Sequence, residues 1–182
     1  AETSTTDNLY LEMDLSQLMQ VTITSVGKKP QSLANTPAPV YVISQEDIRR
    51  SGATSIPEVL AMAPGIQVSQ ISGSKWSISS RGFSGFMSNK LLVLVDGRSV
   101  YSPAYSGVFW DAQNAMLEDI DRIEVIRGPG GTIWGANAVN GVINIITKKA
   151  QDTHGTLVRF GAGTEGRLTA GGRYGGRISD CL

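Results

Sequence analysis

The chain has 182 residues, of which 41% are hydrophobic and 21 are glycine. Sixteen basic residues balance sixteen acidic residues, so the chain lacks the excess of positive charge that is typical of nucleic-acid-binding proteins. One cysteine, Cys181, and one histidine, His154, exclude an internal disulfide and a Cys/His metal cluster. We therefore expect one domain with tails, without a metal site or a cofactor.

Residues 1–29 are predicted to be a mobile segment, because their composition offers little apolar area to anchor them. Within them, one stretch alternates with the period-two pattern of a strand. It consists of Val21, Thr22, Ile23, Thr24 and Ser25. This stretch is either an edge strand of the domain or a strand left free to pair with the sheet edge of another protein.

Residues 30–149 predict an α+β domain with a small mixed sheet and short helices. After a strand over Val40–Ile43, Ser44 is placed to cap a helix, with Asp47 near its positive end. A second helix follows Ser55, which has capping-box spacing to Glu58 and a proline in the first turn.

Further strands are predicted over 66–69 and 78–83. Leu91–Val95 is apolar on both faces, which predicts a central strand, and Val142–Ile146 is predicted to be a second one. Between them, Asp96-Gly97 is a hairpin signal. The sequence therefore predicts a sheet with a well-buried middle.

Arg127-Gly128-Pro129-Gly130-Gly131 forms a glycine-rich loop that resembles a phosphate cradle only superficially. A phosphate loop needs a Gly-Lys-Ser/Thr ending, and the dinucleotide fingerprint needs Gly-x-Gly-x-x-Gly opening a real helix. Neither pattern is present. A tight structural corner is the better interpretation.

The loop over 101–110 carries four aromatic residues, which is more than solubility of a loop requires. They are Tyr101, Tyr105, Phe109 and Trp110. Such side chains either fold back over the core as a lid or line a platform for a ligand, because Tyr and Trp combine apolar area with one polar group.

Residues 150–182 differ from the preceding domain in their hydrophobic pattern. Thr156–Phe160 and Arg167–Tyr174 alternate weakly around a turn, which is typical of outer-membrane barrel strands. The family resemblance described below implies that these residues are a linker and the first one or two strands of a transmembrane β-barrel.

Several motifs occur in one order along the chain. They are Ser-Gln-Glu-Asp-Ile at 44–48, Pro-Glu-Val-Leu at 57–60, Pro-Gly-Ile at 64–66, Arg-Gly at 81–82, Arg-Ile-Glu-Val-Ile-Arg-Gly-Pro at 122–129, Trp-Gly-Ala at 134–136 and Asn-Gly-Val-Ile-Asn-Ile-Ile-Thr-Lys at 140–148. This series resembles the plug domain of TonB-dependent outer-membrane receptors. The resemblance implies active uptake of a scarce nutrient such as a ferric siderophore, for iron uptake, or cobalamin.

The resemblance also implies a place and partners. The plug would occlude the lumen of its own β-barrel in the cell outer membrane of a Gram-negative bacterium, with the N-terminus in the periplasm. Barrels of this type have about 22 strands, most of which lie outside this chain. The implied partners are the energy-coupling protein TonB, the barrel, and a metal chelate or other small nutrient. The receptor would contact the membrane only through its barrel.

Three sets of site residues follow from the resemblance. Val21 to Ser25 sits where the TonB box is expected. Arg81 and Arg127 would be the plug-side partners of barrel-wall glutamates, although both also fit ordinary surface arginines. The segments 74–76, 83–87 and 101–110, here called the apical loops, would touch substrate. Their candidate contacts are Ser74, Lys75, Trp76, Phe83, Phe86, Met87, Tyr101, Tyr105, Phe109 and Trp110.

Two other functions were considered. A free-standing periplasmic ligand-binding or adaptor module with a plug fold remains an alternative, although residues 155–177 would give such a module no advantage. An enzyme is excluded, because the chain has no nucleophile–base constellation. Asp96 and Asp111 are better explained as turn and capping residues.

Overall fold

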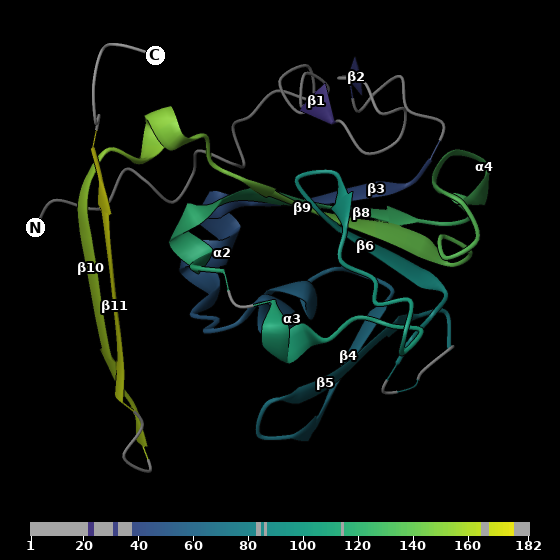
Figure 1. The fold of residues 1–182 in the computed structure, drawn as a ribbon, viewed down its shortest axis with the longest axis horizontal. Coiled ribbons are helices and arrows are strands. Elements are labelled where there is room, and N and C mark those ends of the chain that lie inside the picture. The colour runs from purple at the N-terminus through teal and green to yellow at the C-terminus, as the bar shows by residue number, and fades with distance from the viewer. Residues whose placement is uncertain are drawn as a thin grey trace, which may run out of the picture. The chain divides into compact units, whose positions relative to one another are not determined.

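Figure 1 shows a computed structural model of the chain. It describes residues 22–23, 31–32, 38–82, 85, 87–113, 115–164 and 168–176. The chain divides into two compact units between Ile146 and Thr147, close to the boundary expected after Lys149. Each unit is described by itself.

A five-stranded mixed sheet forms the middle of the first unit, as the sequence predicted. Its strands, in sheet order, are β3 (Val40–Ser44), β8 (Ile120–Arg127), β9 (Gly141–Thr147), β6 (Leu91–Val95) and β7 (Arg98–Ser99). β3 pairs antiparallel with β8, whereas β6 pairs parallel with β9. Both strands predicted to be central, β6 and β9, have neighbours on each side.

The predicted hairpin turn joins β6 to β7. Asp96 and Gly97 have φ values of 49° and 77°, so both central residues are left-handed, which matches the twist of the flanking strands. Val95 then pairs with Arg98 across the turn.

One face of the sheet is covered by two short helices and a hairpin, which lie below it in Figure 1. They are α2 (Gln45–Ser51), α3 (Ile56–Leu60), β4 (Ile66–Ser72) and β5 (Lys75–Ser80). Ile123, Val125 and Ile143 point toward them from the sheet and are fully buried. Val59 and Leu60 of α3 meet these residues, also with no exposed area. The main core therefore lies between the sheet and these elements.

The two helices begin differently. At α2 the predicted cap is present: the Ser44 hydroxyl accepts from the Asp47 N–H, and the Asp47 carboxylate accepts from the Ser44 N–H at 2.9 Å. At α3 the prediction was wrong in detail, because Ser55 makes no side-chain cap bond. The Glu58 carboxylate instead accepts from the Thr54 N–H at 2.6 Å, one residue earlier than the capping-box spacing implies.

The other face of the sheet carries a smaller core. Leu92, Leu94, Ile126 and Val142 point to this side, together with Ala138 from the loop before β9. Ile23 packs on them and is 1% exposed. It belongs to β1 (Thr22–Ile23), which pairs antiparallel with β2 (Gln31–Ser32) above the sheet in Figure 1.

Short elements connect the strands. η2 (Trp110–Ala112) and η3 (Leu117–Asp119) precede β8, and α4 (Gly131–Trp134) follows it. α4 is a single turn of helix, so the glycine-rich loop before it is a corner rather than the start of a long helix.

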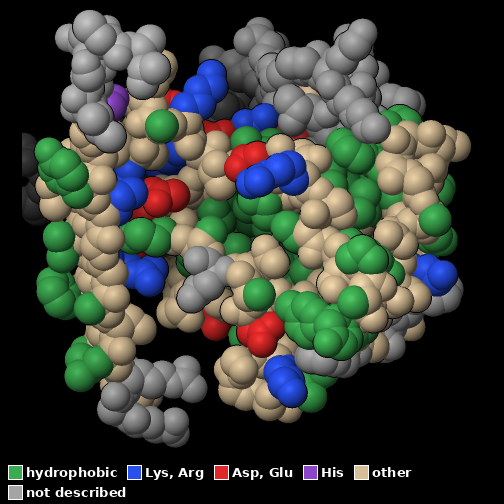
Figure 2. All heavy atoms as spheres, in the orientation of Figure 1, with side chains coloured by type: hydrophobic (Ala, Val, Ile, Leu, Met, Phe, Trp, Pro, Cys, Tyr) green, Lys and Arg blue, Asp and Glu red, His purple; other side chains and the backbone are tan. Residues whose placement is uncertain are grey.

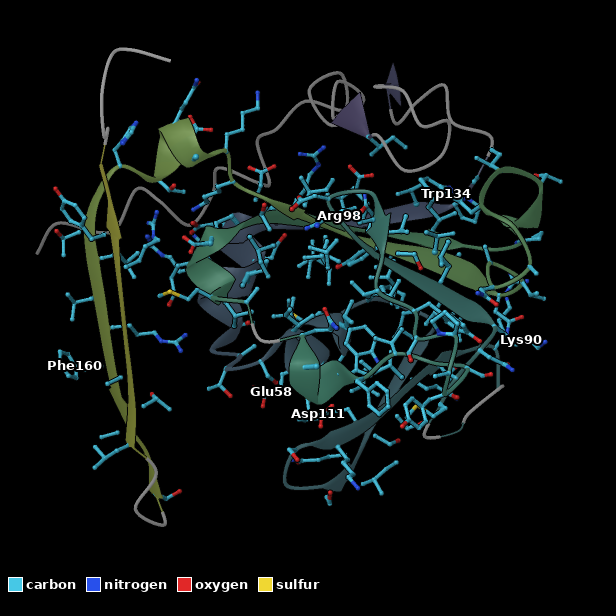
Figure 3. The ribbon with its side chains drawn as sticks, viewed as in Figure 1. Glu58, Lys90, Arg98, Asp111, Trp134 and Phe160 are labelled. Carbon is cyan, nitrogen blue, oxygen red and sulfur yellow. The ribbon has the colours of Figure 1, made fainter. Side chains whose placement is uncertain are left out.

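The second unit contains η4 (Ala150–Thr153) and an antiparallel hairpin of β10 (Gly155–Ala162) and β11 (Leu168–Gly175). One face of the hairpin is apolar and outward: Val158, Phe160, Leu168 and Tyr174 are 61–84% exposed. Figure 3 shows Phe160 standing away from the ribbon on this face. The other face carries arginines, of which Arg173 donates from Nη1 to the Thr153 carbonyl at 2.6 Å.

Candidate functional site

The apical loops, which are separate in sequence, are linked to one another in the first unit. The Ser77 hydroxyl of β5 donates to the Gly85 carbonyl at 2.8 Å, which ties the 83–87 loop to the hairpin. Met87 lies against Gly107 of the third loop; a Cβ at Gly107 would come within 2.8 Å of the Met87 Cβ. A glycine is needed at 107 because no larger residue fits this approach. These contacts connect Gly85 to β5 and Met87 to the 101–110 loop.

The first of these loops differs from its prediction. The region expected as a polar loop over 70–76 is the tip of the β4–β5 hairpin, whose two-residue turn is Gly73-Ser74. Lys75 and Trp76 consequently belong to β5, which ends at Ser80 rather than reaching the predicted residue 83. A register shift between Gln70 and Ser72 bends the tip. Such a bulge leaves no trace in hydrophobic alternation, so the sequence did not reveal it.

The aromatic residues of the 101–110 loop are divided between the core and the surface. Trp110 is 7% exposed and belongs to the main core, so it anchors the loop as a lid residue would. Tyr105 is 64% exposed and meets Phe109 edge to face, with 5.2 Å between ring centroids. Ser102 donates its N–H to the Gly107 carbonyl at 2.8 Å and closes the loop at its base. The exposed tip of the loop, which includes Tyr105, is thus connected to the core through this closed base and through Trp110.

Side chains around this loop are visible in two views. Figure 2 shows hydrophobic side chains gathered on the lower part of the displayed face, and Figure 3 places Asp111 and Glu58 beside α3 at the edge of that region. Phe83 and Phe86, two of the predicted contacts, lie outside the described residues. Ser74, Lys75 and Tyr105 are exposed, and Trp76, Met87, Tyr101 and Phe109 are partly exposed.

Arg81 and Arg127 lie together, which the sequence alone did not indicate. They line a cavity of about 330 Å³ with Pro39, Gly65 and Ser80. Arg81 has a φ of 58°, a conformation that residues other than glycine adopt only under local constraint. The Arg127 Nε is buried and has no hydrogen-bond partner among the described residues. The cavity is therefore lined by two arginines, and the Nε of one of them is a buried donor without a partner among the described residues.

The remaining lining residues were missed by sequence reasoning. Pro39, Gly65 and Ser80 come from three distant points of the chain, and each looks like an ordinary strand or turn residue in isolation. Ser80 donates its hydroxyl to the Gly65 carbonyl at 3.1 Å, which joins the end of β5 to the residue before β4. Only the folded arrangement brings these residues to the arginines.

Of the predicted TonB box, the structure describes Thr22 and Ile23; Val21, Thr24 and Ser25 lie outside the described residues. Ile23 is buried on the sheet rather than free, which differs from the mobile segment expected for residues 1–29. The physical reason is local: the single large apolar residue of the β1 pair covers apolar side chains that would otherwise face water.

The described residues contain neither a candidate metal site nor a candidate membrane-spanning helix. None of their histidine, cysteine, aspartate and glutamate side chains gather in threes at a distance suited to a metal ion. None of their helices has the length and apolarity required to cross a membrane.

Comparison with known proteins gives one consistent family. Residues 32–142 match the family model described as TonB-dependent Receptor Plug Domain. The vitamin B12 transporter BtuB of Vibrio vulnificus is 37% identical over 161 residues, which are 88% of this chain and 26% of that protein. The chain thus spans about a quarter of the curated relatives it matches.

Solved structures agree with this match. The ferripyoverdine receptor of the outer membrane of Pseudomonas aeruginosa is 26% identical, with a TM-score of 0.63 over 82% of this chain and 19% of that one. The ferric-catecholate import receptor Fiu of E. coli K12 is also 26% identical, with a TM-score of 0.61 over 86% of this chain and 22% of that one. These relatives are transporters and receptors, not enzymes. The family model covers more than half of the chain, so the chain belongs to the TonB-dependent receptor plug domain family.

Proposed function

We propose that this chain is the plug of an outer-membrane receptor for active uptake of a scarce nutrient, such as a ferric siderophore or cobalamin. The observation that carries the proposal is the match of residues 32–142 to the plug-domain family. Named relatives at 26–37% identity transport vitamin B12 or bind ferric chelates. The substrate would contact the apical loops, with the plug occluding the barrel.

The second unit supports a place in the outer membrane. β10 and β11 form a hairpin with an apolar face and an arginine-bearing face, which is the alternation of a strand pair between lipid and a polar lumen. A free-standing periplasmic module would expose Phe160 and Leu168, each more than 80% accessible, to water without gain. In this arrangement the N-terminus would face the periplasm.

The arginine cavity suits a contact between the plug and the barrel wall. Two guanidinium groups present donors in a planar fork, the geometry that carboxylates accept. The buried, unused Nε of Arg127 adds a donor whose burial costs free energy until an acceptor arrives. Glutamates projecting into the lumen would satisfy this requirement, and we assign Arg81 and Arg127 this role.

Coupling to TonB would use Val21 to Ser25 as an added strand. Strand addition draws its affinity from main-chain hydrogen bonds, so the segment must first leave the sheet face where Ile23 is docked. Burial of one isoleucine side chain stabilises the docked form by about 1.5–3 kcal/mol, and the ladder of β1 with β2 is only two residues long. The docked form is thus weak enough for a partner to displace.

The test uses the full-length receptor with Ile23→Pro and Ile23→Ala. Proline removes a ladder donor and fixes φ away from the extended pairing geometry, so the isolated periplasmic domain of TonB should no longer bind this variant. Ile23→Ala should keep the main-chain pairing and lose only a modest part of the affinity. Substrate should still bind at the cell surface in both variants, whereas uptake should fail in Ile23→Pro.

Normal TonB binding and normal uptake by Ile23→Pro would contradict the coupling assignment. Thermal unfolding of each variant supplies the control, because β1 lies outside the five-stranded sheet and the plug should stay folded. A variant that unfolds would instead assign the strand a structural role.

A further inference from the structure

The cavity beside Arg81 and Arg127 has two positive side chains on its wall and no acidic one. Its other lining residues are Pro39, Gly65 and Ser80. In the part of the chain that the structure describes, no ion pair joins either arginine to a carboxylate. Two positive charges that border one small space repel each other, and an anion that enters this space removes the repulsion.

Two glycines leave room around the arginine side chains. A Cβ built on Gly128, the residue after Arg127, would lie 3.9 Å from Nη2 of Arg81. A Cβ built on Gly65 would lie 3.7 Å from Cδ of Arg127. The guanidinium group of Arg81 therefore reaches the backbone next to Arg127, and both arginines border space that no side chain of either glycine fills.

The wall of the cavity is held by hydrogen bonds that do not use the guanidinium groups. The Arg127 backbone N–H donates to the Pro39 carbonyl at 2.9 Å, and the Ser80 hydroxyl donates to the Gly65 carbonyl at 3.1 Å. The side-chain amide of Asn140 donates to the Ser80 carbonyl at 3.3 Å. The site is thus formed without a ligand, and either arginine side chain can be replaced while these bonds remain.

The cavity offers a donor that needs an acceptor, and it is open to a small ion. The Nε of Arg127 is buried and has no hydrogen-bond partner among the described residues, which costs free energy until an acceptor arrives. Arg81 is exposed, so one side of the site faces solvent. The volume of about 330 Å³ is at the lower end of the range for ligand sites, which suits a small hydrated ion better than a metal chelate.

We propose that this cavity is a binding site for a small oxyanion with two negative charges, of the class of inorganic phosphate and sulfate. A dianion neutralises both guanidinium groups, whereas a carboxylate or a phosphodiester neutralises only one. The oxygens of a tetrahedral anion accept from the forked N–H donors of arginine. The inference requires only the cavity and goes beyond the receptor function, in which a barrel-wall glutamate and the free oxyanion would compete for the same donors.

The experiment titrates the 182-residue chain with anions and follows the Nε–H resonance of Arg127 by NMR. At about pH 7.5 and a constant ionic strength of about 0.15 M, phosphate should shift this resonance with a dissociation constant on the order of 1 mM. Sulfate should bind within about threefold of phosphate, while acetate and dimethyl phosphate, which carry one charge each, should bind at least about tenfold more weakly. Thermal stabilisation is not a suitable measurement, because phosphate and sulfate also stabilise proteins by exclusion from their surface.

Three variants locate the anion at the two arginines. Arg81→Gln and Arg127→Gln should each weaken phosphate binding at least about tenfold, since each removes one charge and one set of donors. Arg127→Lys keeps the charge but loses the planar fork, and should still weaken binding about fivefold. For the Arg127 variants, the backbone N–H of Gly128 replaces the lost resonance as the measured group.

Arg49→Gln is the matched control. Arg49 is an exposed arginine of α2 and does not line the cavity, so phosphate binding should be unchanged. Circular dichroism of each variant checks that the chain is folded. If one arginine variant fails to fold, the series of anions on the unmodified chain still decides the question.

The inference would be overturned by an Arg127 resonance that does not respond to phosphate up to about 20 mM, or that responds equally to chloride at matched ionic strength. Acetate binding as tightly as phosphate, or unchanged binding in both glutamine variants, would also overturn it. The receptor function is tested separately by TonB binding and uptake of the full-length receptor, so either proposal can fail while the other stands.

Discussion

The two faces of the central sheet are built differently. The face toward α2, α3 and the β4–β5 hairpin is covered by continuous chain, with seventeen residues in its buried cluster. Among the described residues, the opposite face has six, and one of these, Ile23, comes from a two-residue strand near the N-terminus. We call the first cluster the permanent core and the second the detachable core, because the coupling proposed above requires the β1 segment to leave that face.

The most sensitive test compares two adjacent leucines of β6. Leu91 points into the permanent core and Leu92 into the detachable one, and both are at most 5% exposed. Leu91→Ala should cost about 3–5 kcal/mol of unfolding free energy, while Leu92→Ala should cost about 2, because its surroundings can relax around the smaller side chain. Urea unfolding of the 182-residue chain measures both. Equal losses would contradict the difference between the faces.

A smaller effect is expected from Ile23→Ala. Its cost cannot exceed the free energy of docking, so we expect about 1–2 kcal/mol rather than the larger loss of a core isoleucine. The expected signature is local: the bonds around Lys28 and Lys29 should become more accessible to trypsin while global unfolding is nearly unchanged. A full-sized loss of global stability would place Ile23 in the permanent core.

The smallest effects compare the two helix starts on the permanent side. Ser44→Ala removes a cap that is made and should cost about 1 kcal/mol. Ser55→Ala removes a hydroxyl whose oxygen is buried and has no hydrogen-bond partner in the part of the chain that the structure describes, so its cost should be close to zero. Thermal unfolding of the two variants side by side checks this order. A larger loss in Ser55→Ala would show that its hydroxyl has a partner.

Local signals in the sequence were sufficient for much of the fold. The apolar run of β6, the Asp96-Gly97 turn and the Ser44 cap each depend on residues close together in the chain, and each is present. The motif series also identified the plug family. Long-range contacts were not predictable. The Arg81 and Arg127 cavity and the contact of Met87 with Gly107 join segments of unrelated pattern, and only the tertiary structure brings them together.

The docking of Ile23 was missed for a different reason. Composition shows whether a segment has enough apolar area to fold by itself, and residues 1–29 do not. It does not show that a single isoleucine can complete a core that another part of the chain has left open. The strand was predicted to be either an edge strand or free to pair with another protein, whereas the structure buries Ile23 in one cluster with Leu92, Leu94 and Val142.

The position of β3 has a mechanical consequence. β3 is the edge strand of the sheet and the first sheet strand in the chain, so a tension applied at the N-terminus reaches it after the β1–β2 pair and before any other strand of the sheet. β1 is held by two residue pairs and β3 by five, from Val40 with Ile126 to Ser44 with Arg122. Under such tension the β1–β2 pair should separate first, and the longer β3–β8 pair should separate after it. The chain can then lengthen at its N-terminal end while β8, β9, β6 and β7 stay paired.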